Sequence, residues 1–116
     1  MSGPRTLRGV VRLRNAVSAP CTLRVKIEDV SRADAAARAV AEAVVRLEQP
    51  LAAGANVPFS ITVPEVSESI RYNVRAHIDC SGSGEINVGD LISTQAYPVM
   101  TQEHADNVTV EVEAVR

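Results

Sequence analysis

The stretch VKIEDVSRADAAA, from Val25 to Ala37, decides the fold class of this chain. Its first half alternates, so that Val25 and Ile27 lie on one face of an extended strand and charged side chains lie on the other. The alternation ends at a polar corner, Asp29 to Asp34, and a second apolar stretch follows. An alternating run that is bounded by a polar corner predicts a β-strand with one buried face.

The same alternation recurs along the chain. It runs through TLRGVVRLR (6–14), CTLRVKIEDV (21–30), NVPFSITV (56–63), IRYNVRAHIDC (70–80) and NVTVEVEAV (107–115). Clusters of Pro, Gly, Asn and Ser separate these segments, and this pattern predicts antiparallel β-structure and an all-β fold. The side chains expected to form the core are Leu23, Val25, Ile27, Phe59, Ile61, Val74, Ala76 and Ile78.

Two other segments are ambiguous. ADAAARAVAEAVVRLE (33–48) has helical propensity, and Ser31 with Asp34 resembles a capping box. The residues from Ala39 to Leu47 also alternate, however, which favours a strand. GEINVGDLISTQAYPVM (84–100) is interrupted by glycines and a proline, and predicts one or two short strands with a bend at a sheet edge, where proline is tolerated.

Several short motifs carry a resemblance to a known family. EDVSRADA (28–35) and AYPVMT (96–101) are the most specific of them, and NVPFSITVPE (56–65) and IRYNVRAHID (70–79) accompany them. Over Thr6 to Val115 the chain resembles the YbaY/YscW family of small bacterial domains, which includes the type III secretion lipoprotein chaperones, or pilotins.

The resemblance carries expectations about fold and function. It implies a single antiparallel β-sandwich or partly open barrel of about six to eight strands, extending over residues 1–116. It also implies a loop or short helical turn through Ala37, followed by a strand from Ala39 to Leu47. The chaperone members of the family imply a module that binds a peptide or protein partner.

Composition excludes several classes of function. The formal net charge of −2 over 116 residues creates no field that would draw nucleic acid. No segment approaches the ~20 consecutive apolar residues of a membrane span. A lipoprotein signal ending at Cys21 is excluded because Arg5, Arg8, Arg12 and Arg14 interrupt its apolar region. The expected location is therefore the cytoplasm, or the periplasm or outer membrane if the chain was trimmed from a longer one.

A search for catalytic groups identifies no catalytic, cofactor-binding or metal-binding residues. The two histidines, His77 and His104, lie in polar surroundings and are expected at the surface. Glu28 and Asp29 are adjacent, so on a strand they point to opposite faces. The Ser81–Glu85 turn, SGSGE, lacks the lysine and following helix of a phosphate-binding loop, and predicts a flexible hairpin tip. The chain is therefore not expected to be an enzyme.

The two cysteines carry a geometric hypothesis. Cys21 opens an alternating segment and Cys80 closes another, both on the apolar face. If these strands are neighbours, the thiols lie at one end and a disulfide can form, provided that the Cα atoms come within about 7 Å. The alternative is a pair of buried reduced thiols in a reducing cytoplasm.

Charged residues on the first and last alternating segments suggest a pairing. Arg8, Arg12 and Arg14 share one polar face, and Glu111 and Glu113 share another, so they become cross-strand partners if these strands pair. The alternative is an arginine-rich patch, extended by Arg71 and Arg75, that docks an acidic partner.

Three classes of function remain compatible with the sequence. The favoured class is a non-enzymatic, chaperone-like module without a cofactor that binds a protein or peptide. The second is a small-ligand barrel, for which one Phe and two Tyr supply little aromatic lining. The third is an enzyme, for which no catalytic constellation can be assembled. The irregular segment from Glu85 to Met100 is the region predicted to bind the partner, because an open sheet edge can accept an added strand.

Overall fold

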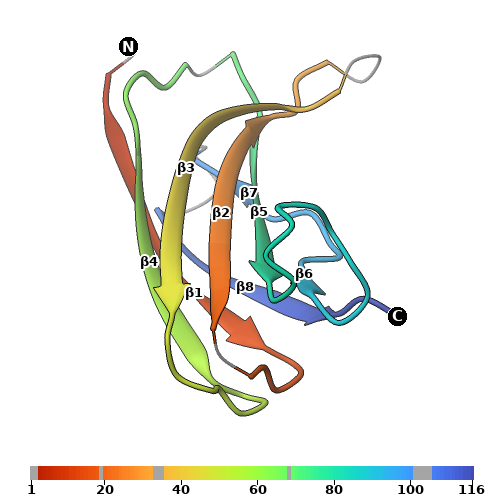
Figure 1. Ribbon diagram of the computed structural model, residues 1–116. Coiled ribbons are helices and arrows are strands. Elements are labelled where there is room, and N and C mark those ends of the chain that lie inside the picture. Colours follow the sequence, from red (N-terminus) through yellow and green to blue (C-terminus); the bar gives the residue numbers. More distant parts are fainter. Residues whose placement is uncertain (1–2, 19, 33–35, 68, 101–105) are drawn as a thin grey trace.

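A computed structural model describes residues 3–18, 20–32, 36–67, 69–100 and 106–116, and these residues form strands and loops without a helix (Figure 1). The all-β prediction and the predicted number of strands are confirmed. The eight strands are β1 (Arg5–Leu13), β2 (Cys21–Asp29), β3 (Arg38–Leu47), β4 (Asn56–Val63), β5 (Tyr72–Asp79), β6 (Leu91–Ile92), β7 (Pro98–Val99) and β8 (Asn107–Ala114).

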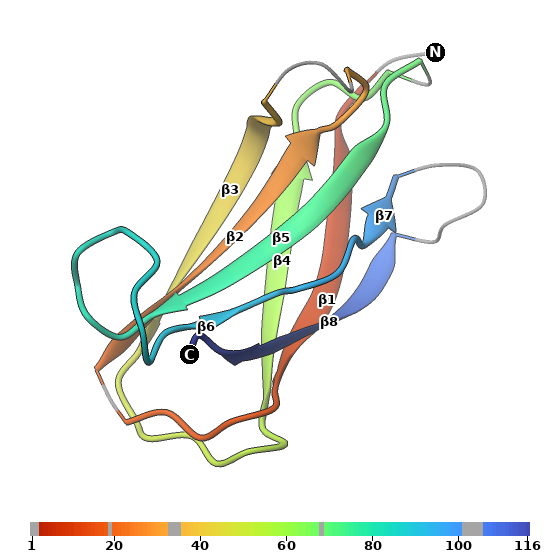
Figure 2. The ribbon, with the colours of Figure 1, turned by 90° about the vertical axis from the view of Figure 1, so that its right-hand side faces the viewer.

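All eight strands belong to one sheet. Its order is β3-β2-β5-β6-β8-β1-β4, with the short β7 paired to β5 beside this path. The seven strands of the path wrap through 281°, so the sheet forms a nearly closed barrel (Figure 2). The two strands at the ends of the order, β3 and β4, leave the seam of the barrel open, which agrees with the predicted partly open barrel.

The sheet is mixed, so the prediction of purely antiparallel structure is wrong in one place. β1 pairs antiparallel with β4 but parallel with β8, with Val11 opposite Val110. Every other ladder between the strands is antiparallel. Alternation could not distinguish the two cases, because it specifies which face a side chain takes and leaves the direction of the neighbouring strand open.

The predicted core is confirmed. All eight residues named from the alternation are buried, from Val25 and Ile27 with no exposed surface to Phe59 with 6 % exposed. The inward side chains of β1 and β8, among them Leu7, Val11 and Val110, complete the same cluster with no exposed surface. The interior of the barrel is therefore filled with aliphatic side chains around one phenylalanine.

The alanine-rich segment is a strand. β3 pairs antiparallel with β2 over its whole length, with one register shift between Ile27 and Glu28. Pairing with a neighbouring strand has overridden the helical propensity of the alanines. Ser31 does not cap a helix: its N–H donates to Asp29 Oδ1 at 2.9 Å, and its hydroxyl accepts the N–H of Arg71 at 2.8 Å. Asp34, the other half of the predicted capping box, lies outside the described residues.

The segment from Glu85 to Met100 contains two short strands, as predicted, but it does not lie at a free edge. β6 pairs with β5 on one side and with β8 on the other, so the segment closes the barrel between them. Among the described residues, β3 and β4 lie at the two ends of the strand order, and the short β7 pairs with β5 alone. Glycine and proline in this segment limit its strands to two residues each, but β6 still lies between β5 and β8, inside the sheet.

Candidate functional site

A loop between β5 and β6, residues 80–90, is built around the buried carboxylate of Asp79. Asp79 is 3 % exposed and accepts hydrogen bonds from the N–H groups of Ser81, Gly82 and Gly84 at 2.9–3.1 Å. The two glycines have φ of +78° and +80°, the left-handed conformation that glycine adopts without strain. The SGSGE turn is therefore an anion-binding arrangement of N–H groups whose anion is the chain's own aspartate, rather than a flexible tip.

A second buried carboxylate, Asp90, closes the other end of the loop. It is 1 % exposed and accepts the N–H groups of Cys80 at 3.0 Å and Asn87 at 3.1 Å. The His77 Nε2 atom lies 2.9 Å from Asp90 Oδ2. The expectation of a surface histidine is wrong for His77, because the loop covers it and leaves 13 % of its side chain exposed. His104 lies outside the described residues.

His77, Asp79 and Asp90 together resemble a metal site at first sight. One ligand atom of each lies within 4.8 Å of the others. Both carboxylates, however, already accept N–H groups from the loop, and a cation would have to displace them. These three side chains are therefore better explained as groups that hold the loop in place than as the ligands of a metal ion.

Both aspartates are more acidic than usual. Burial by itself raises the pKa of Asp79, but the N–H groups of Gly84 and Gly82, the Ser81 hydroxyl and the nearby His77 bring its pKa below the ordinary value. Burial also acts to raise the pKa of Asp90, and hydrogen bonds from His77, Cys80 and Asn87 lower it overall. Both groups are therefore carboxylates when the domain is folded at neutral pH.

The lowered pKa values predict acid lability. A carboxylate with a lower pKa in the folded state than in the unfolded state stabilises the fold above about pH 4, and this contribution is lost as pH falls through the folded pKa. We expect Asp79→Asn to lower the free energy of unfolding at neutral pH and to bring its value close to wild type in acid. Urea titrations at several pH values measure this, and parallel pH curves for the two proteins would contradict it.

Beneath the loop, the outer face of the sheet is hollowed. A hollow of 360 Å³ is lined by three residues of β2, two residues of β5 and the loop at 84–86. The strand residues are Arg24, Lys26, Glu28, Arg75 and His77. Four of these strand residues are cross-strand neighbours, with Arg24 opposite His77 and Lys26 opposite Arg75. The alternation that points Val25 and Ala76 into the core also points these charged side chains outward.

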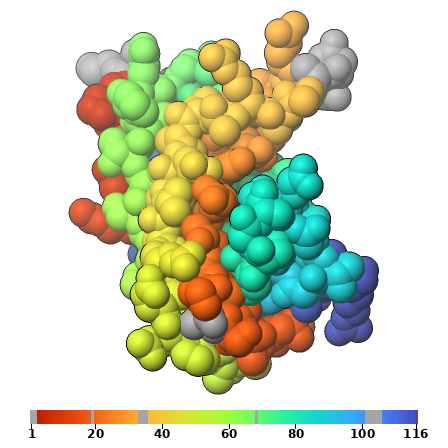
Figure 3. Space-filling view, viewed as in Figure 1, coloured from red at the N-terminus to blue at the C-terminus, as the bar shows by residue number. Residues whose placement is uncertain are grey.

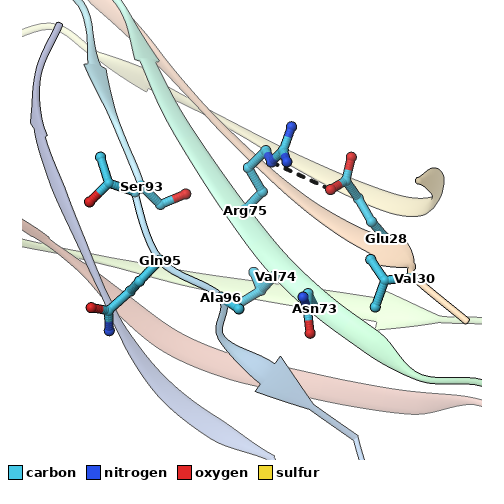
Figure 4. Close-up of a pocket in the computed structure, with 9 residues that line it drawn as sticks. Glu28, Val30, Asn73, Val74, Arg75, Ser93, Gln95 and Ala96 are labelled. Atoms are coloured by element: carbon cyan, nitrogen blue, oxygen red, sulfur yellow. Dashed lines mark ion pairs between the residues drawn. The ribbon is translucent and has the colours of Figure 1, made fainter. Parts of the chain in front are cut away.

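A second hollow, of 260 Å³, lies further along β5 (Figure 4). It opens where residues 93–96 diverge from β5 between β6 and β7. Hydrogen bonds to β5 mark its two ends. At one end Ser93 exchanges two with Ala76, from Ala76 N–H to Ser93 Oγ and from Ser93 N–H to the Ala76 carbonyl, and at the other Val74 N–H donates to the Tyr97 carbonyl, all at 3.0 Å. Because β6 and β7 are only two residues long, the chain between them leaves β5, and a polar recess opens there in the sheet.

One ion pair separates the two hollows. Arg75 Nε lies 3.4 Å from Glu28 Oε1, at the edge of the smaller hollow (Figure 4). Both residues also line the larger hollow. The Arg75 side chain is 63 % exposed, whereas that of Glu28 is 12 % exposed. The two hollows therefore form one interrupted groove along the outer face of β2 and β5, which we call the β2/β5 groove.

Exposed apolar side chains flank the β2/β5 groove. The large hydrophobic residues that are most exposed among those described are Val44 on β3, and Ile86 and Val88 on the loop. Val44 is the cross-strand partner of Arg24, and Ile86 lines the larger hollow itself. In the space-filling view the loop, coloured teal, stands out on one side of β2, and β3, coloured yellow, lies on the other side (Figure 3).

Comparison with known proteins assigns the family. The family model for the type III secretion system lipoprotein chaperone (YscW) matches residues 3–112. The chain belongs to the YscW family. Its fold also matches a solved structure described as an alternative pilotin from the type II secretion system of Vibrio cholerae, with a TM-score of 0.80 and 24 % sequence identity. That match covers 97 % of this chain and 98 % of the other, and no curated protein matches the sequence.

The comparison confirms the resemblance found from the sequence motifs. The family is described as a type III secretion system lipoprotein chaperone, which agrees with the favoured class of function. In the part of this YscW-family chain that the structure describes, no helix is long and apolar enough to cross a membrane.

The cysteines of this YscW-family domain meet as the geometric hypothesis requires. Cys21 Sγ lies 2.6 Å from Cys80 Sγ, and both are free thiols in the structure. Burial, the contact with Cys21 and nearby negative groups raise the pKa of Cys80 to about 12. The Cys80 thiolate is therefore scarce at neutral pH, which slows its oxidation because the thiolate is the reactive form.

Oxidation is expected to join the two thiols. A disulfide would close a loop of 59 residues and stabilise the YscW-family domain by about 2–4 kcal/mol. We expect the two titratable thiols to disappear in the presence of a disulfide oxidant, faster as pH rises, and the midpoint of urea unfolding to increase. Cys80→Ser is the control and should show no stabilisation. If two free thiols can still be titrated in the unfolded protein after prolonged oxidation, no disulfide has formed and the pairing is contradicted.

The predicted pairing of the terminal strands is confirmed, but the charges do not form ion pairs. Arg12 lies opposite Glu111 in the parallel ladder of β1 and β8. Among the described residues, however, no ion pair joins the predicted arginines of β1 to Glu111 or Glu113 of β8. Glu113 instead accepts a hydrogen bond from the Thr94 hydroxyl at 3.0 Å. Of the alternative arginine patch, only Arg75 reaches the β2/β5 groove.

Proposed function

We propose that this domain is a secretion-associated, chaperone-like module that binds a polypeptide and catalyses no reaction. Membership of the YscW family is the main support for the proposal, because the family is described as a type III secretion system lipoprotein chaperone. The fold shared with a pilotin of a type II secretion system is consistent with such a role.

The geometry supports a partner that binds on the outside. The two hollows of the β2/β5 groove lie on the outer face of the sheet. The barrel interior, by contrast, is occupied by side chains such as Leu7, Leu23 and Val110 that have no exposed surface. A small ligand inside the barrel would have to displace this packing, so the groove supports a polypeptide partner better than an interior ligand.

The titratable groups near the groove also support a binding role. His77, Asp79 and Asp90 are engaged with each other or with N–H groups of the loop. Catalysis would need a nucleophile and base with access to a substrate. In the described residues these groups instead hold the loop in place.

Capture followed by reconstitution tests the proposal. The tagged domain is used to isolate proteins from the native host, and each candidate is then purified and titrated against the domain by calorimetry. We expect one polypeptide to bind saturably and to slow amide exchange on the outer face, in β2, β5 and residues 84–96. If no purified polypeptide binds and a small molecule instead protects the core amides, the domain is a small-ligand barrel.

A further inference from the structure

We propose that the β2/β5 groove recognises an acidic, amphipathic segment of the partner, in which carboxylates stand beside apolar side chains. This inference rests on the proposed function and adds to it the place of binding and the chemistry of the bound segment. Three features of the groove support it: its local charge, an arginine that is in none of the ion pairs found among the described residues, and its apolar flanks.

The local charge of the groove is opposite to that of the whole chain. The larger hollow is lined by three cationic side chains, Arg24, Lys26 and Arg75, against two carboxylates, Glu28 and Glu85. The chain as a whole has a formal net charge of −2. The lining thus carries one more positive charge than negative, and Arg24 is the one of its three cations that is in no ion pair found among the described residues.

Arg24 supplies the most specific reason for a carboxylate. Its Nε atom is buried and has no hydrogen-bond partner among the described residues. Arg24 is also absent from the ion pairs found there, whereas Lys26 lies 3.9 Å from Glu42 and Arg75 lies 3.4 Å from Glu28. Because Arg24 also lines the larger hollow, a carboxylate that enters the hollow can form a charge-assisted hydrogen bond with the part of its guanidinium that faces the hollow.

The exposed apolar side chains beside the groove require apolar residues in the bound segment, in addition to a carboxylate. Val44 is 55 % exposed on the β3 side of Arg24, and Ile86 is 53 % exposed on the loop side of the same hollow. A segment that lies over Arg24 therefore meets a cation in the middle and an apolar side chain on each side. An acidic segment without apolar residues would leave Val44 and Ile86 exposed to water, so it should bind more weakly.

Charge reversal in the groove tests the inference with the partner that the capture experiment supplies. We expect Arg24→Glu to weaken binding by about tenfold or more, because it places a like charge opposite the partner's carboxylate. Val44→Ser should weaken binding by a smaller factor. Arg12→Glu, which reverses an exposed arginine on β1, is the matched control and should leave the dissociation constant unchanged. Circular dichroism checks that each variant is folded.

Lys26 permits a second test that does not depend on loss of binding. It is the chain's single lysine, so a zero-length carbodiimide joins its Nζ atom to a carboxylate in direct contact. In the free domain that carboxylate is Glu42. We expect the bound partner to give an intermolecular cross-link from Lys26 to an Asp or Glu of the partner, and Lys26→Arg to abolish this cross-link while binding persists.

The outcomes separate the two proposals. If the wild-type domain binds no polypeptide, both the proposed function and the inference are wrong. If a polypeptide binds wild type and Arg24→Glu equally, and cross-links form only at the chain's N-terminal amine, the proposed function stands and the inference is wrong. The inference is also wrong if vesicles containing phosphatidylglycerol, and no polypeptide, bind wild type and fail to bind Arg24→Glu.

Discussion

Phe59→Ala is expected to lower the free energy of unfolding by about 3–5 kcal/mol, the range observed for large-to-small changes at buried aromatic residues. Phe59 is the chain's single phenylalanine and is 6 % exposed. Its neighbours on the inner face are aliphatic residues of a stiff, mostly β-branched sheet, which cannot collapse to fill the space that the ring leaves. The substitution therefore removes apolar burial and leaves a cavity at the same time.

Urea titration measures the effect. Val44→Ala is a suitable control, because it truncates an apolar side chain that is already 55 % exposed and should change stability by no more than about 0.5 kcal/mol. A loss below about 1 kcal/mol for Phe59→Ala would show that the ring is not part of the core.

Gly9→Ala is expected to cost about 1–3 kcal/mol, an unusually large effect for the addition of one methyl group to a strand. Gly9 lies opposite Phe59 on β4 and opposite Val108 on β8. A Cβ atom at Gly9 would overlap the Val108 carbonyl oxygen and would lie 2.9 Å from Phe59 Cζ. Because the first of these contacts is with backbone, the β1–β8 ladder would have to open to relieve it.

A double-mutant cycle separates the two contacts. Adding Phe59→Ala to Gly9→Ala removes the overlap with the ring but not the overlap with the Val108 carbonyl, so part of the cost of the alanine should remain. Arg12→Ala, an exposed change on the same strand, is the control. If Gly9→Ala is neutral, β8 does not lie parallel and close beside β1, and the barrel is not closed between these two strands.

Predictions from the sequence succeeded where the information is local. The alternation of Val25 with Lys26, or of Ala76 with His77, specifies an inner and an outer face without reference to any other strand. The eight predicted core residues are buried for this reason. The Ala39–Leu47 strand was ambiguous from the same local information, since alanine suits a helix and the alternation suits a strand. It became a strand because β2 offers it a complete ladder of partners.

The candidate site was largely hidden from the sequence. Arg24 and Lys26 appeared only as outward residues of one alternating segment, and Arg75 was grouped with the more conspicuous arginines of β1 rather than with them. The sequence does contain two signals, namely the polar face shared by Arg75 and His77, and the apolar Ile86 and Val88 in a glycine-rich loop. Neither signal indicates a groove unless β2, β5 and the loop are known to be adjacent.

The sequence by itself determined the strands, their inner and outer faces and the family, because a period of two residues and short motifs are properties of neighbouring positions. The tertiary structure alone decided the parallel pairing of β1 with β8, the position of β6 inside the sheet and the meeting of Cys21 with Cys80. It also decided that Asp79 and Asp90 anchor a loop over the β2/β5 groove. Each of these depends on which distant segments pack together, and this is set by the burial and hydrogen bonding of the whole chain rather than by any one stretch of it.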